Sequence, residues 1–242
     1  INGTQMMTAI GALMVHDAER LVEQAEKSGA LSFDVLQGLA EAFDRRLHKA
    51  RPHPGQMTSA EHLARLLQGS KLVASGEERV RRGLHRQDPY TLRCIPQVMG
   101  AARDAVGYAS KVIEVELNSA SDNPLIFPED EAVISGGNFH GQPIAIVLDL
   151  LAIAMATIGN FVERRITRLL DPKLNLGLPA FLVPSTEKAG LNSGLMTAQY
   201  SAAALASENK VLAHPASVDS IPTSADFEDF VSMGPAAALK LT

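Results

Sequence analysis

Three long stretches with a helical spacing of apolar residues most limit what this chain can fold into. The stretch from Pro96 to about Asn118 keeps a helical period, Gln142 to Leu170 is nearly all apolar until Glu163, and Ser193 to Ala213 is rich in Ala. Helices that are apolar on most faces pack inside a bundle or an oligomer. The sequence therefore predicts an all-α fold, built as a long-helix bundle.

Length and hydropathy favour one helical domain of a soluble protein. The most apolar run, Ile144 to Ile158, is shorter than the ~20 residues that a membrane span needs, and it carries Asp149. With 242 residues and 46% hydrophobic content, the chain can bury a substantial core. We expect one continuous helical domain over residues 1–242 rather than two small ones.

Charge, cysteine content and motifs exclude several classes of function. The 27 acidic and 22 basic residues are mixed along the chain and give a net charge of −5, so we expect no nucleic-acid or membrane partner. Cys94 is the only cysteine, which predicts a buried thiol and a cytoplasmic, reducing compartment. The sequence has no Gly-Lys-Ser/Thr phosphate loop, His-Glu-x-x-His motif or Gly-x-Ser-x-Gly elbow, so we expect neither ATP hydrolysis nor a metal.

Shorter helices are predicted before residue 70. Ser32 is a suitable N-cap for an amphipathic helix, whose apolar face would contain Leu36, Leu39, Ala40, Phe43 and Leu47. The Pro-rich segment 51–56 would interrupt this helix, and Thr58 with Glu61 has the capping-box spacing that starts another. His53 and His62 are expected on the surface.

The segment Gln87-Asp-Pro-Tyr-Thr-Leu-Arg93 places an amide, a phenol and a guanidinium within seven residues. An Arg can bind a carboxylate bidentately, a Tyr can transfer a proton when its pKa is lowered, and a Gln can orient polar atoms. These groups suit an amino-acid ligand. The residues alone favour a structural alternative, in which Asp88-Pro89 caps a helix and Arg93 forms a surface ion pair.

Two later segments are weaker candidates for a site. Gly136-Gly-Asn-Phe-His-Gly141 could bring backbone N–H groups to a ligand with Phe139 as an apolar wall, or it could be a plain Gly-rich turn. Glu228 and Asp229 would be costly to bury unless paired or protonated, and N-terminal helix acids are an equally good interpretation.

Ordered motifs along the chain resemble those of the aromatic amino-acid ammonia-lyases, and most closely the histidine ammonia-lyases. They are Ile1-Asn-Gly-Thr-Gln5, Gln87 to Cys94 with Pro96-Gln-Val-Met-Gly100, Ser121-Asp-Asn-Pro124, Gly136 to Gly141, Glu163-Arg-Arg165, Leu191-Asn-Ser-Gly194, Ala206-Ser-Glu-Asn-Lys210 and Val231-Ser-Met-Gly234. The resemblance implies a homotetramer whose active sites each draw residues from three subunits. It also implies that the fold is similar to that of the fumarase and aspartase superfamily, although the Gly-Ser-Ser-x-Met-Pro-x-Lys-x-Asn signature of those enzymes is absent.

The resemblance further implies a prosthetic group, 4-methylidene-imidazol-5-one (MIO), that forms by cyclisation of an Ala-Ser-Gly triad. In the family this triad and a catalytic Tyr on a loop precede the segment that matches Ile1-Asn-Gly-Thr4. We therefore expect the chain to be an internal piece of the catalytic core, inactive by itself, without the N-terminal MIO-bearing segment and the C-terminal end. Ala74-Ser75-Gly76 spells the same triad but lies outside the family motif, so we reject it as the source of MIO.

Carried over by position, the resemblance assigns a role to six residues. Asn2 would contact MIO or the substrate amino group, Tyr90 would assist proton transfer, and Arg93 would hold the substrate carboxylate. Gln87, Phe139 and Glu228 would complete the pocket, with Glu228 counted among the catalytic groups.

One departure concerns the substrate. Histidine-specific members generally have Asn-Gln-Glu-Asp-His where this chain has Asp226-Phe-Glu-Asp-Phe230. The retained Glu228 suits an imidazole or a phenol, whereas Phe227 and Phe230 make its surroundings more apolar. Histidine is thus slightly preferred over tyrosine or phenylalanine, and the product could be an unsaturated acid or, as in 2,3-aminomutases, a β-amino acid. A non-catalytic helical oligomerisation protein is a further alternative, against which the intact Gln87, Tyr90, Arg93 and Glu228 argue.

Overall fold

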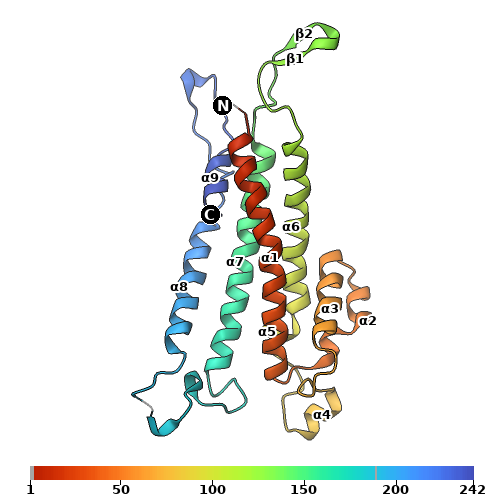
Figure 1. The fold of residues 1–242 in the computed structure, drawn as a ribbon, viewed down its shortest axis with the longest axis vertical. Helices are drawn as coiled ribbons and strands as arrows, with labels where there is room; N and C mark the ends of the chain where they lie inside the picture. Colours follow the sequence, from red (N-terminus) through yellow and green to blue (C-terminus); the bar gives the residue numbers. More distant parts are fainter. Residues whose placement is uncertain (1–2, 189) are drawn as a thin grey trace. The chain divides into compact units, whose positions relative to one another are not determined.

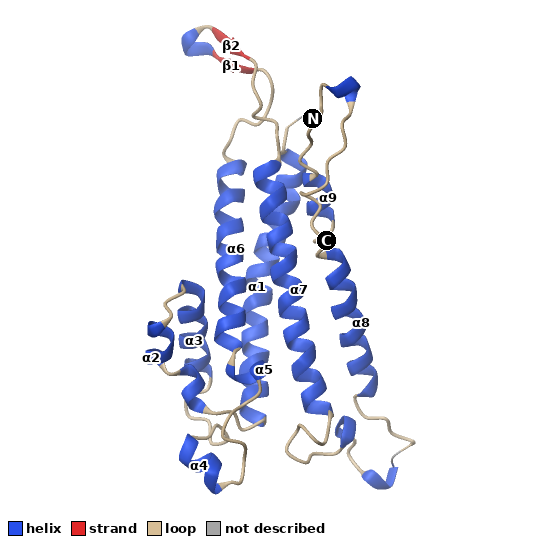
Figure 2. Cartoon of the chain, turned by 180° about the vertical axis from the view of Figure 1, so that it is seen from behind, coloured by secondary structure: helices blue, strands red, loops and turns tan. Residues whose placement is uncertain are grey.

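The computed structural model describes residues 3–188 and 190–242, and helices make up most of it (Figure 1). In chain order the elements are α1 (Gln5–Val35), η1 (Ala40–Phe43), α2 (Arg45–Ala50), α3 (Pro54–Leu66), α4 (Gly76–Arg81), α5 (Tyr90–Arg93), α6 (Ile95–Leu117), β1 (Leu125–Phe127), η2 (Pro128–Asp130), β2 (Ala132–Ile134), α7 (Gln142–Leu170), η3 (Ala180–Leu182), η4 (Thr186–Lys188), α8 (Met196–Leu212), η5 (Ser224–Asp226) and α9 (Gly234–Leu239). Strands β1 and β2 form an antiparallel hairpin (Figure 2). The predicted all-α class is confirmed, with this small hairpin added.

The long helices confirm the apolar patterns from which they were predicted. Helix α7 has the predicted bounds, α6 begins one residue earlier and ends one residue earlier than expected, and α8 is shorter than expected at its start. Helix α7 is long and apolar enough to cross a membrane, with a mean hydropathy of 2.1 over its most apolar window, but 56% of that window is buried inside the structure. We therefore interpret α7 as a core helix of the bundle.

Contacts divide the chain into two compact units. The first contains the chain up to Glu19, Ala105–Ala154 and Lys210–Thr242, and the second contains Arg20–Asp104 and Met155–Asn209. Helices α1, α6, α7 and α8 each contribute residues to both. That residues 1–242 form part of one catalytic domain stays a prediction.

The core of the first unit forms where α1, α6 and α7 meet. A Cβ added at Gly11 of α1 would lie 2.7 Å from Cδ1 of Ile113 in α6 and 3.2 Å from Cδ2 of Leu148 in α7. Ile113 and Leu148 are buried, as is Val15 one turn further along α1. The missing side chain at Gly11 therefore lets three helices approach closely.

Asp149 ties the C-terminal part of the chain to α7. Its carboxylate accepts hydrogen bonds from the N–H groups of Ala216 (3.1 Å) and Ser217 (2.6 Å) and pairs with Nζ of Lys240 at 2.9 Å. Burial alone would raise the pKa of Asp149, but these donors hold the pKa below its ordinary value. The segment that follows α8 and leads to Glu228 is therefore anchored to α7 at Asp149.

In the second unit, α3 and α6 touch through their backbones. A Cβ added at Gly55 would lie 2.2 Å from the carbonyl oxygen of Gly100, and one added at Gly100 would lie 2.3 Å from the backbone nitrogen of Gln56. The N–H of Gly55 also donates to Oδ1 of Asp104 at 2.8 Å. Two glycines thus allow a contact that side chains at these positions would prevent.

A buried carboxylate joins α1, α3 and α6 in the same unit. Glu26 accepts two hydrogen bonds from Arg103, at 2.8 and 2.6 Å, and lies 2.5 Å from Nδ1 of His62. Burial raises the pKa of Glu26, but Arg103 and His62 lower it more, so the carboxyl stays ionised. His62, predicted to be a surface residue, is half-buried in this pairing, whereas His53 is exposed as expected.

The predicted helix starts at Ser32 and Thr58 are also wrong. Ser32 lies in the last turn of α1, which ends at Val35, and its hydroxyl donates to the carbonyl of Ser28 at 2.8 Å. Helix α3 begins at Pro54, and the Thr58 hydroxyl donates to the carbonyl of Pro54 at 3.1 Å. Both hydroxyls bond to a carbonyl four residues back, which is typical of a helix interior rather than of an N-cap.

Candidate active site

Tyr90 and Arg93 form the centre of the candidate site in the second unit. They begin and end the single turn of α5, which follows Pro89, and their three-residue spacing places both on one face. The guanidinium carbon of Arg93 lies 5.0 Å from the centroid of the Tyr90 ring, a cation–π contact. Tyr90 is 68% exposed and Arg93 is half-buried, so both groups can reach a ligand.

Asp88 holds this turn to the rest of the unit. Its buried carboxylate accepts from the N–H of Leu39 at 2.6 Å and pairs with the buried Arg79. Arg79 also donates to the carbonyls of Gln37 (3.1 Å) and His85 (2.9 Å). The part of the structural alternative in which Asp88-Pro89 caps a helix is confirmed, because Pro89 is the N-cap of α5, although no side chain caps this helix.

The neighbours of this turn have simpler roles. Gln87 is exposed, which leaves its amide accessible. Arg93 contacts Tyr90 rather than forming the surface ion pair of the structural alternative. Cys94 is half-buried rather than buried as the sequence predicted, and this partial burial raises the pKa of its thiol.

Phe139 and Glu228 both belong to the first unit. Phe139 lies in the loop between β2 and α7 and is 40% exposed. Glu228 follows η5 and is exposed, and its Oε2 accepts hydrogen bonds from Thr223 (3.0 Å) and Ser224 (2.7 Å). These hydroxyls lower the pKa of Glu228, which keeps a carboxylate available as an acceptor. Asn2 lies outside the described residues.

The Ala74-Ser75-Gly76 triad makes several structural contacts. Ala74 is fully buried in a backbone bridge to Leu39, the hydroxyl of Ser75 accepts from the N–H of Glu78 at the start of α4, and the N–H of Gly76 donates to Glu41. These contacts give all three residues a part in holding the local fold. Ser75 is the N-cap of α4.

Replacement of Ser75 with Ala should therefore lower the free energy of unfolding by about 1 kcal/mol, the usual size of a lost N-cap, and leave turnover unchanged. Urea unfolding and steady-state kinetics of the complete protein would measure both. Ser201→Ala, at an exposed position within α8, is the control. Loss of turnover in the Ser75 variant alone would show that the triad does serve as the cofactor source.

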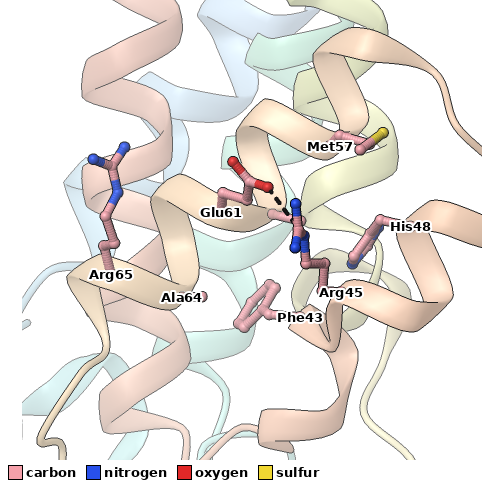
Figure 3. A pocket seen from close by; sticks show the side chains of 8 residues that line it. Phe43, Arg45, His48, Met57, Glu61, Ala64 and Arg65 are labelled. Atoms are coloured by element: carbon pink, nitrogen blue, oxygen red, sulfur yellow. Dashed lines mark ion pairs between the residues drawn. The ribbon is translucent and has the colours of Figure 1, made fainter.

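A pocket of about 490 Å³ lies elsewhere in the second unit, between η1, α2 and α3 (Figure 3). Phe43, Met57 and Ala64 supply apolar walls, and Arg45 pairs with Glu61 at 3.6 Å across it. It contains none of the six candidate site residues. The candidate site residues therefore lie outside this pocket.

The whole chain, residues 1–242, matches the family model described as aromatic amino acid lyase. It belongs to that family. A histidine ammonia-lyase of Alkaliphilus oremlandii is 60% identical over 241 residues, which are 99% of this chain and 46% of that protein, and one of Alkaliphilus metalliredigens is 56% identical with the same coverage. The chain thus spans about half the length of the curated relatives it matches.

Solved structures agree with this assignment to the aromatic amino acid lyases. The tyrosine aminomutase of Streptomyces globisporus is 40% identical with a TM-score of 0.94, and 100% of this chain covers 48% of it. The histidine ammonia-lyase of Trypanosoma cruzi is 44% identical with a TM-score of 0.86, and 100% of this chain covers 43% of it. The resemblance inferred from the motifs is confirmed.

The residues that support the site were not found from sequence. Arg79 lies in a charged stretch of sequence, and only the structure reveals that it is buried and pairs with Asp88. The family motif contained His140, but its contact with Phe230 across ninety positions left no local signal.

Proposed function

We propose that this chain is the part of a longer ammonia-lyase that supplies Tyr90, Arg93 and Glu228 to the active site, and that the whole enzyme converts L-histidine to urocanate. The observation that carries the choice of histidine is the exposed, ionised carboxylate of Glu228, which can accept an N–H from an imidazole ring. The high identity to curated histidine ammonia-lyases supports the same choice.

The chemistry requires a weakly acidic β-proton to leave and an amine to be expelled. Arg93 would hold the substrate carboxylate through two parallel hydrogen bonds, and Tyr90 beside it would carry a proton. The guanidinium close to the Tyr90 ring would stabilise negative charge that develops on the phenol oxygen. Gln87 would orient the substrate, Asn2 would contact its amino group, and Phe139 would form an apolar wall.

MIO would supply the electrophile that makes the amino group a better leaving group. The groups that this chain offers fit such a partner, because the exposed phenol and the guanidinium of α5 provide a proton carrier and a carboxylate anchor but no electrophile. We propose that the Ala-Ser-Gly source lies in the segment that precedes Ile1 in the relatives, with Asn2 as the contact from this chain. No metal is proposed.

We further propose a cytoplasmic homotetramer. Tyr90 with Arg93 belongs to one compact unit and Phe139 with Glu228 to the other. In a tetramer whose sites each draw on three subunits, residues from the two units of one chain can serve different sites. The single half-buried Cys94 suits a reducing compartment.

A tyrosine or phenylalanine ammonia-lyase or 2,3-aminomutase is the second candidate. It is favoured by Phe227 and Phe230, which are 92% and 58% exposed beside Glu228 and would offer an apolar surface to a benzene ring. The likeness to a tyrosine aminomutase supports the same alternative.

The test supplies L-histidine, L-tyrosine and L-phenylalanine separately to the complete protein. Ultraviolet absorbance would follow the conjugated acid, and chromatography would follow any β-amino acid. Urocanate from histidine alone is the expected result. Coumarate, cinnamate or a β-amino acid would replace the histidine proposal by the second candidate, and no turnover of any substrate would favour a non-catalytic oligomerisation protein.

A further inference from the structure

His140 joins two loops of the first unit, each of which carries a candidate site residue. It directly follows Phe139, and its Nε2 lies 3.2 Å from the carbonyl oxygen of Phe230, two residues after Glu228. The rings of His140 and Phe230 are also stacked, with centroids 5.8 Å apart and planes 13° from parallel. One side chain thus makes both a polar and an apolar contact with the Glu228 segment.

The backbone next to this contact is tightly packed. A Cβ added at Gly141 would lie 2.5 Å from Sδ of Met7 and 3.1 Å from Oγ of Ser232, and one added at Gly234 would lie 2.3 Å from the same sulfur. Met7 is buried. The two loops therefore meet at this tightly packed backbone, and His140, next to Gly141, contacts Phe230.

Glu228 itself is held mainly by a short turn. The N–H of Thr223 donates to the carbonyl of Glu228 at 3.0 Å, and the intervening Ser224, Ala225 and Asp226 all have positive φ, between 53° and 64°. Residues other than glycine adopt this region at a cost. The turn fixes the local backbone shape around Glu228. The direction in which the turn points therefore depends on what holds the residues that follow it.

Two contacts hold the irregular segment that follows Glu228. The N–H of Val231 donates to the hydroxyl of Ser220 at 3.1 Å, within the same segment. The contact of His140 with Phe230 comes from a different loop. It can therefore orient the whole turn that carries Glu228 relative to the packed backbone at Gly141 and Gly234. A donor on His140 is needed, because Nε2 faces a carbonyl oxygen.

We propose that His140 is a positioning residue for Glu228: by donating Nε2–H to the carbonyl of Phe230, it sets the place at which the Glu228 carboxylate meets the substrate ring. This inference rests on the proposed function, because it needs a substrate that Glu228 binds. His140 itself does not touch the substrate in this proposal.

Three variants of the complete protein separate the polar from the apolar contact. His140→Ala should lower kcat/KM by about three- to tenfold, the effect of one hydrogen bond, and chiefly through a higher KM. His140→Gln keeps an N–H at nearly the position of Nε2 and should recover most of the loss, whereas His140→Phe keeps the stacking and should not. His53→Gln, at an exposed position without a side-chain cap bond, is the matched control and should match the wild type.

A double-variant cycle with Glu228→Gln tests whether His140 acts through Glu228. If it does, His140→Ala should change kcat/KM little once Glu228 has been replaced. Losses that multiply in the double variant, or a Gln variant no better than the Phe variant, would overturn the proposal. If the His140→Ala variant does not fold, the comparison of His140→Gln with His140→Phe still tests the proposal.

The choice of substrate does not affect this cycle. If the complete protein turns over tyrosine or phenylalanine instead of histidine, the histidine proposal fails, and the same cycle measured with the actual substrate still tests His140. Coupling with any aromatic substrate supports the role, and strict additivity contradicts it.

Discussion

Tyr90→Phe should lower kcat of the complete enzyme by roughly 10²- to 10⁴-fold, the contribution of a positioned proton-transfer group, with a much smaller change in KM. The reason is that the replacement removes only the hydroxyl, while Arg93 remains beside the ring to hold the substrate carboxylate. Steady-state kinetics with the preferred substrate would measure both constants.

Tyr108→Phe is the matched control for this experiment. Tyr108 lies on α6 and is 53% exposed, close to the 68% of Tyr90, so the same chemical change is made in a similar environment. Its kcat should equal that of the wild type. A Tyr90→Phe enzyme within threefold of the wild type would remove Tyr90 from the mechanism.

Asp88→Ala should lower the free energy of unfolding by about 3–5 kcal/mol, the cost of leaving one partner of a buried ion pair uncompensated. Arg79 would then be buried with a positive charge and without its carboxylate, and Leu39 would lose the acceptor of its N–H. Denaturant unfolding of the complete protein, followed by circular dichroism, would measure the change.

Two further variants show whether charge causes this loss. Lys27→Met removes an exposed ion pair with Glu23 and should cost no more than about 1 kcal/mol. Arg79→Met combined with Asp88→Ala should be more stable than Asp88→Ala alone, since no unpaired charge remains buried. A double variant less stable than the single one would mean that Asp88 acts through packing instead.

Helix α7 could be predicted to the residue, whereas α1 was missed as one element. In α7 the apolar residues continue for about six turns, and few positions compete with the helical pattern. Helix α1 carries charged residues along its exposed side, and its buried positions, such as Val15, Ala18, Val22 and Ala25, recur every three or four residues. This helical spacing is a weaker signal than the apolar run of α7, because small or polar residues occupy several of the buried positions.

Hydroxyl side chains explain the wrong helix starts. Ser32, Thr58 and Ser75 are all suitable N-caps by residue type, yet only Ser75 accepts a backbone N–H as a cap. The other two donate to carbonyls inside a helix that has already begun. The choice between the two roles depends on the backbone before the residue, and residue type alone does not decide it.

The candidate site was predictable only within short segments. The three-residue spacing of Tyr90 and Arg93 foretells their proximity, because both lie on one turn. The burial of Asp88 and the link between His140 and Phe230 depend on residues 49 and 90 positions away. Such partners follow from the fold and not from the motif in which each residue lies.

The backbone contact between Gly55 and Gly100 has a consequence for how motif residues are interpreted. Gly100 closes one of the segments that carry the family resemblance, but it has no functional group, and its environment leaves space only for a hydrogen atom. An Ala at either position would have to displace α3, and the bonded Asp104 with it, before it affected any ligand. A residue in a family motif can thus be needed only because a larger side chain would not fit, and not because it takes part in the reaction.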